Sequence, residues 1–140
     1  MAGTFIKALC FLLFIITVSS ETFSQQGMIR TVYFKTNSAV IENKYKTVLN
    51  EIAAKANSDS VAFLKIFAYA DPPGSKKHND WLSKQRAMAI ETYLRKQTKI
   101  GASKIYVTWI GESAEAYDFH LPDPHVQKRC VDIWLSVVDN

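Results

Sequence analysis

Apolar positions along the chain recur with two different periods, and these periods predict its secondary structure. Residues 28–34, MIRTVYF, are β-branched and aromatic, which is typical of a strand. Residues 43–57 instead repeat apolar side chains at helical spacing, with Asn43 as a candidate N-cap. Residues 61–70, VAFLKIFAYA, are apolar at both odd and even positions, so they predict a central strand that is covered on both faces or nearly so.

The second half of the chain repeats this alternation. A helix is predicted from Asn79, as N-cap, to about Thr98, and strands are predicted over 103–111 and 128–138. The stretch between these strands, 112–127, is too long and too rich in proline for a simple hairpin turn. The order strand, helix, strand, helix, strand, strand predicts one α/β (α+β) sandwich, with helices packed on a single sheet.

One charged residue interrupts the apolar stripe of the second helix. At 100° per residue, Arg86 lies only about 40° from Leu82, in the middle of the side that faces the core. An unpaired guanidinium in an apolar setting would cost several kcal/mol, so the pattern predicts a partner for it. Asp71 follows the strand at 61–70 and is the nearest candidate. The pair would be either a structural ion pair or a binding site for a ligand with complementary charges.

The first residues have the composition of a leader and not of a core. Lys7 precedes an apolar run, 8–18, and small residues follow up to Ser24, which is typical of a secretory signal peptide. The run is too short for a membrane-spanning helix. We therefore expect residues 1–24 to be a signal peptide, with cleavage between Ser20 and Ser24, and residues 25–140 to be a single domain without a transmembrane segment.

Composition and motif spacing limit the classes of function further. The formal net charge of +4 comes from dispersed lysines and arginines, a pattern that does not favour nucleic-acid binding. His120, Asp123 and His125 lie close together, but the prolines between them do not give the spacing of a known metal motif. Cys130 is a weak candidate nucleophile, because nothing in the sequence marks a base beside it. We expect no metal site, no cofactor and no catalytic residue, so the chain is predicted not to be an enzyme.

A longer motif is more specific than any of these features. Residues 69–94, YADPPGSKKHNDWLSKQRAMAIETYL, resemble the central motif of the OmpA-like peptidoglycan-binding domain family. The matching positions are Asp71, Gly74, Asn79, Leu82, Ser83, Arg86 and Ala87. The resemblance also covers 32–41, VYFKTNSAVI, 102–114, ASKIYVTWIGESA, and 128–133, KRCVDI. It implies a β-α-β-α-β-β fold with two main helices packed on one mixed four-stranded sheet.

The resemblance also implies a function. It implies a non-catalytic protein that binds peptidoglycan through the diaminopimelate of the stem peptide. In that family pattern Asp71 would accept from the ligand ammonium and Arg86 would bind its carboxylate, while Asn37 and Asn79 would line the pocket; Leu82 and Arg129 complete the set. Other outer-membrane or envelope proteins would be further partners. The expected location is the periplasm or the outer membrane, with the cell surface as second choice.

Three positions depart from the family pattern and leave a second function open. Lys35 stands where an acidic residue is common, Ala70 lacks a hydroxyl beside Asp71, and Lys128 replaces an asparagine. If these departures close the site, Lys35 would pair with Asp71. The fold would then serve as a module that binds other envelope proteins.

Overall fold

The computed structural model describes residues 27–58, 61–70, 74–111 and 129–137. These residues form four strands and two α-helices in the order that the apolar pattern predicts. The elements are β1 (Gly27–Tyr33), α2 (Asn43–Ser58), β2 (Val61–Ala68), α3 (Lys76–Gln97), β3 (Ile105–Trp109) and β4 (Cys130–Val137), with a short 3-10 turn (Ala102–Lys104) before β3.

The four strands make one mixed sheet in the order β1-β4-β2-β3. β4 runs antiparallel to both β1 and β2, whereas β2 and β3 are parallel and connected through α3. Leu64 of β2 is therefore flanked by Ile105 of β3 and by Leu135 of β4. The prediction of a central strand at 61–70 and of a mixed four-stranded sheet is confirmed.

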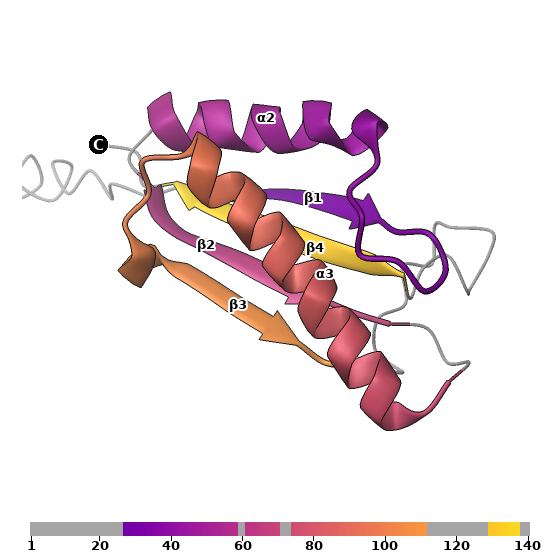
Figure 1. Ribbon diagram of the computed structural model, residues 1–140. Helices are drawn as coiled ribbons and strands as arrows, with labels where there is room; N and C mark the ends of the chain where they lie inside the picture. The colour runs from indigo at the N-terminus through magenta and orange to yellow at the C-terminus, as the bar shows by residue number, and fades with distance from the viewer. Residues whose placement is uncertain (1–26, 59–60, 71–73, 112–128, 138–140) are drawn as a thin grey trace, which may run out of the picture.

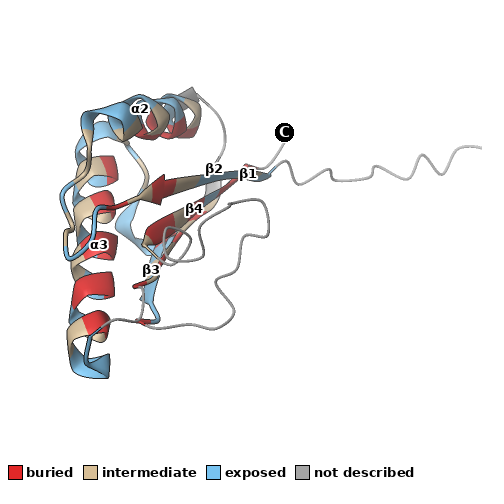
Figure 2. Cartoon of the chain, turned by 90° about the vertical axis from the view of Figure 1, so that its right-hand side faces the viewer, coloured by how far each residue is buried: buried red, intermediate tan, exposed pale blue. Residues whose placement is uncertain are grey.

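Both helices pack on the same face of the sheet, as Figure 1 shows. The buried residues gather between the helices and the sheet (Figure 2), which places the core in a single layer. Within α2 the predicted apolar stripe faces this layer, because Leu49, Ile52 and Ala53 are buried. Because the helix-facing residues of β2 and β4 alternate with others at period two, each strand supplies its aliphatic side chains to this one core.

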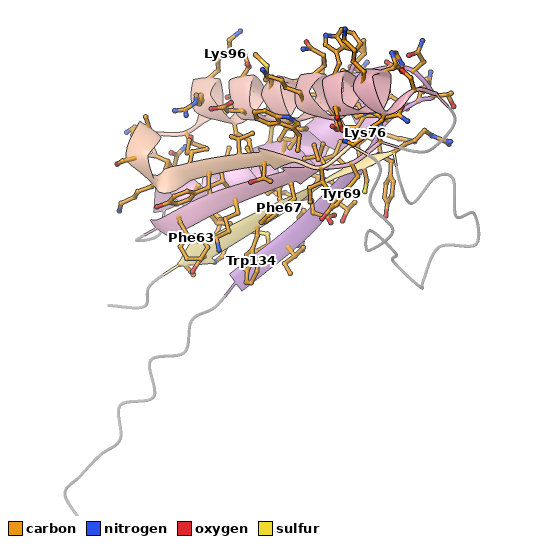
Figure 3. All side chains as sticks on the ribbon, turned by 90° about the horizontal axis from the view of Figure 1, so that it is seen from below. Phe63, Phe67, Tyr69, Lys76, Lys96 and Trp134 are labelled. Carbon is orange, nitrogen blue, oxygen red and sulfur yellow. The ribbon has the colours of Figure 1, made fainter. Side chains whose placement is uncertain are left out.

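The other face of the sheet corrects one prediction. We expected β2 to be covered on both faces or nearly so, but Phe63, Lys65 and Phe67 are only partly buried, and no helix among the described segments lies over them (Figure 3). Lys65 and the rings of Phe63 and Trp134 cover one another instead. The Lys65 ammonium lies 4.7 Å from the Phe63 ring centroid and 5.5 Å from that of Trp134. An apolar run can thus belong to a one-sided sheet when aromatic rings and a lysine stem share the exposed face.

The start of α3 corrects a second prediction. The N-cap is Ser75 and not Asn79, because the Ser75 hydroxyl accepts a 3.2 Å hydrogen bond from the backbone N–H of His78. The backbone N–H of Asn79 bonds the carbonyl of Ser75, so Asn79 lies inside the first turn, where it is buried. Serine and asparagine are comparable caps, and the structure uses the one that lengthens the helix.

Candidate functional site

The turn after β1 forms one side of the candidate site. Residues 35–38 make a tight turn in which the N–H of Ser38 donates to the carbonyl of Lys35 at 3.2 Å. Asn37 occupies the left-handed region, with φ of 52°, which asparagine tolerates better than most residues. This conformation turns the backbone sharply, so the carbonyls of Lys35 and Ser38 can both reach the same donor.

That donor is the guanidinium of Arg86. Its Nε donates to the Ser38 carbonyl at 2.9 Å, its Nη1 to the Tyr69 carbonyl at 3.0 Å and its Nη2 to the Lys35 carbonyl at 3.3 Å. The guanidinium carbon also lies 5.4 Å from the ring centroid of Phe34. Arg86 is 0% exposed, so the predicted burial is confirmed. Three backbone dipoles contribute to its neutralisation by turning their negative ends toward the charge.

Asn79 lies one helical turn before Ser83 and is 1% exposed. Gly74 makes room for it, since a Cβ on Gly74 would lie 3.2 Å from the Asn79 side-chain oxygen. Gly74 also has a φ of 138°, which side-chain-bearing residues rarely adopt. The loop before α3 therefore approaches the Asn79 amide closely.

Asn37 is connected to α3 by a residue that the sequence interpretation missed. The His78 ring nitrogen Nε2 lies 2.8 Å from the Asn37 side-chain oxygen, and the His78 ring packs at 5.9 Å from the Trp81 ring. The sequence interpretation missed His78 because it placed the start of the helix at Asn79, which left His78 in the loop before α3. With Ser75 as N-cap, His78 falls in the first turn and faces the 35–38 turn.

Arg129 and Leu82 are the other two described residues of the predicted site. Arg129 precedes β4 and lies beside Phe34, whose N–H donates to the Arg129 carbonyl at 2.7 Å, while Arg129 Nε approaches the Phe34 carbonyl at 3.4 Å. Phe34 therefore contacts both arginines. Leu82 is 3% exposed on the core-facing side of α3. The structure thus brings Arg86, Arg129 and the 35–38 turn together, and it places Leu82 in the packed interior.

Asp71 lies outside the described residues, as do Pro72, Pro73 and Lys128. The chain is described up to Ala70, whose N–H bonds the Gly111 carbonyl at 2.8 Å. Arg86 reaches the carbonyl of Tyr69, two residues before Asp71. The guanidinium therefore lies near the end of the segment that leads to Asp71, while the pairing of Arg86 with Asp71 stays a prediction. His120, Asp123 and His125 also lie outside the description, and the described residues contain no cluster suited to a metal ion.

A comparison with known protein families decides which family the chain belongs to. A model of the OmpA family matches residues 33–129. The chain belongs to the OmpA family. The matched range contains the 35–38 turn, the end of β2, α3 and Arg129, so the described site residues lie within the OmpA-family region.

Solved structures agree on the fold of this OmpA-family chain. The peptidoglycan-associated lipoprotein from Burkholderia pseudomallei is 23% identical with a TM-score of 0.61, over 79% of this chain and 90% of that one. The OmpA-like domain of FopA1 from Francisella tularensis is 22% identical with a TM-score of 0.56, over 81% and 77%. The periplasmic domain of Helicobacter pylori MotB is 16% identical with a TM-score of 0.59, over 84% and 80%. No curated protein matches the sequence.

No α-helix among the described residues is long and apolar enough to cross a membrane. In this OmpA-family fold, the site lies at one end of the sheet. There the carboxyl ends of β1 and β2, the start of β4 and the first turns of α3 converge.

Proposed function

We propose that this OmpA-family protein is a non-catalytic component of the cell envelope that binds peptidoglycan through the diaminopimelate of the stem peptide. The observation that carries the proposal is the position of Arg86, a buried positive charge that bonds the Tyr69 carbonyl just past the carboxyl end of β2, two residues before Asp71 in the sequence. Carboxyl ends of sheet strands are frequent ligand sites in α/β folds. A structural relative of this chain is itself named a peptidoglycan-associated lipoprotein.

The proposed roles follow from charge. Diaminopimelate carries an ammonium and a carboxylate at the end of its side chain, so it needs an acceptor and a cationic donor at short separation. Asp71 would accept from the ammonium, and Arg86 would attract the carboxylate. The amides of Asn37 and Asn79 would supply neutral hydrogen bonds, and Arg129 would add positive charge near Phe34. This arrangement also predicts a location in the periplasm or at the outer membrane.

Replacing Asp71 gives a sharper test than replacing Arg86, because Arg86 also supports the backbone. Asp71→Asn keeps the size of the side chain and removes its charge. We expect the mature chain to pellet with peptidoglycan sacculi and the variant to bind at least ~30-fold more weakly, since losing one partner of a buried charge pair costs about 2 kcal/mol or more. Asp80→Asn is the matched control, because Asp80 pairs with Lys76 on the exposed side of α3.

A competition experiment tests the identity of the ligand. Free meso-diaminopimelate should release the protein from sacculi, whereas Nα-acetyl-lysine amide, which keeps a side-chain ammonium and has no carboxylate, should not. Release by both compounds, or an Asp71→Asn variant that pellets like the unchanged chain, would contradict the proposed site.

A second candidate function rests on the three carbonyls around Arg86. Because Lys35, Ser38 and Tyr69 give this guanidinium polar partners within the protein, the fold can hold it without a ligand. The domain would then bind another envelope protein. Failure of the folded, unchanged chain to pellet with sacculi would favour this alternative.

A further inference from the structure

The outer side of α3 carries a second surface that the peptidoglycan proposal does not use. Lys77, Trp81, Lys84 and Met88 follow one another at helical spacing and are all exposed. Trp81 is 55% exposed and Met88 is 45% exposed, which is high for large apolar side chains. We call these four residues the outer stripe of α3. Trp81 lies about 140° around the helix from Arg86, so the stripe faces away from the core.

The apolar part of this surface continues onto β3. The Lys84 ammonium lies 5.0 Å from the Trp109 ring centroid. Trp109 is 42% exposed and its neighbour Ile110 is 43% exposed. Lysine stems and aromatic rings therefore alternate across the helix and the adjoining strand. Such a surface can present apolar area and positive charge to the same partner.

The charge of α3 is unbalanced on this side. Lys76 is paired with Asp80 and Arg95 with Glu91. Lys77 and Lys84 form no ion pair within the described part of the chain. Figure 3 shows nitrogen-tipped side chains projecting from the side of α3 that is turned away from the sheet. The stripe is therefore a positive surface with exposed apolar side chains between its charges.

We propose that the outer stripe of α3 docks on the surface of a bilayer that contains anionic phospholipids. Lys77 and Lys84 would meet lipid phosphates, while Trp81 and Met88 would enter the headgroup region. Indole rings suit that region because they combine an apolar body with a polar N–H.

A bilayer fits this surface better than a folded partner for a geometric reason. The stripe lies along the outer, convex side of a 22-residue helix. A fluid headgroup layer adapts to a convex surface, and its charge complements the two lysines. Because the stripe and Arg86 occupy different sides of α3, one molecule would be able to bind wall and membrane together.

Vesicle sedimentation tests the proposal. The chain from residue 25 onward retains every described element and lacks the apolar leader. We expect it to pellet with phosphatidylcholine vesicles that contain phosphatidylglycerol, and not with phosphatidylcholine alone. Lys77→Ala with Lys84→Ala should weaken binding about 25-fold, since each basic residue near an anionic surface contributes about fivefold. Trp81→Ala should weaken it about tenfold, because the indole loses its place in the headgroup region.

Matched controls come from the opposite side of the molecule. Trp134→Ala removes an equally large ring that is 41% exposed on the face without helices, and Lys65→Ala removes a charge there. Neither change should alter vesicle binding. Asp71→Asn should leave it unchanged as well, which separates this proposal from peptidoglycan binding.

Fluorescence reports the contact directly. With Trp109→Phe and Trp134→Phe in place, Trp81 is the remaining indole of the chain, and its emission should shift to shorter wavelength on addition of anionic vesicles. Absence of vesicle binding by the unchanged chain would overturn the proposal. Equal binding to neutral vesicles, or full binding after loss of Lys77 and Lys84, would overturn it too.

Discussion

At the scale of a single residue, Arg86 holds two separate segments of the chain together. The sequence placed it in the core-facing stripe and required a partner, and the structure gives it three backbone carbonyls from two separate segments. A planar guanidinium with several directed N–H groups can bond all three at once, which a lysine ammonium on a flexible stem does less well. Arg86 thus fixes the 35–38 turn relative to the end of β2, whatever ligand the site receives.

This role predicts a large effect on stability. Arg86→Ala should lower the free energy of unfolding by about 3–5 kcal/mol, because three carbonyls lose their donor and a cavity opens beside Phe34. Arg86→Lys should cost less, since it keeps the charge and part of the volume. Urea unfolding followed by circular dichroism measures both. A loss below ~1 kcal/mol for Arg86→Ala would show that the three hydrogen bonds do not support the fold.

At the scale of an element, α3 organises the site. Its first turn meets the 35–38 turn through His78, its second turn supplies Ser83, and its third supplies Arg86. Ser83 accepts from the Gly111 N–H at 3.1 Å and donates to the Asp80 carbonyl at 3.0 Å, so it connects the helix to the end of β3. Gly111 lies directly against Asp80 at this point.

The close approach at Gly111 predicts a sensitive position. Gly111 has φ of 63°, and a Cβ there would overlap the Asp80 carboxylate and lie 3.3 Å from the Asp80 Cα. Gly111→Ala should therefore cost at least ~2 kcal/mol of stability through strain and displacement of α3. Gly101→Ala is the control, since its nearest neighbour would be the Ser103 hydroxyl at 3.9 Å. Equal melting temperatures for the two variants would contradict this account.

The elements show which features the sequence could predict. Periodicity placed both helices, all four strands and the burial of Arg86, because these depend on local spacing. The start of α3 was predicted at Asn79 and not at Ser75, since two good caps stand four residues apart and only tertiary contact decides between them. The bond between His78 and Asn37 and the carbonyls around Arg86 also depend on how distant segments meet. The role of Asp71 stays a prediction.

At the scale of the whole molecule, the order of strands in the sheet determines which strands we expect to unfold last. β2 and β4 are internal strands, whereas β1 and β3 form the two edges. The family resemblance implied a mixed four-stranded sheet, and the structure and the family match confirm it. Strand composition alone did not give the strand order, since an edge strand such as β1 is also β-branched and aromatic.

Hydrogen exchange tests this arrangement. Amides of β4 that bond β1 and β2 should exchange only through global unfolding, whereas amides on the outer edge of β1 should exchange through local opening. Ile133 and Leu135 are suitable reporters, because both are buried and flanked by strands on both sides. Faster exchange in β4 than in β3 would be inconsistent with the internal position of β4.

The place of β4 has a consequence for biosynthesis. β4 is the last of the described strands in the chain, yet it lies between β1 and β2, and β1 pairs with β4 alone among them. The first strand therefore has no partner until residue 137 has left the ribosome. We therefore expect the four-stranded sheet to be completed only after β4 has been synthesised. That delay suits a protein whose leader is expected to direct it through a translocation channel as an extended chain.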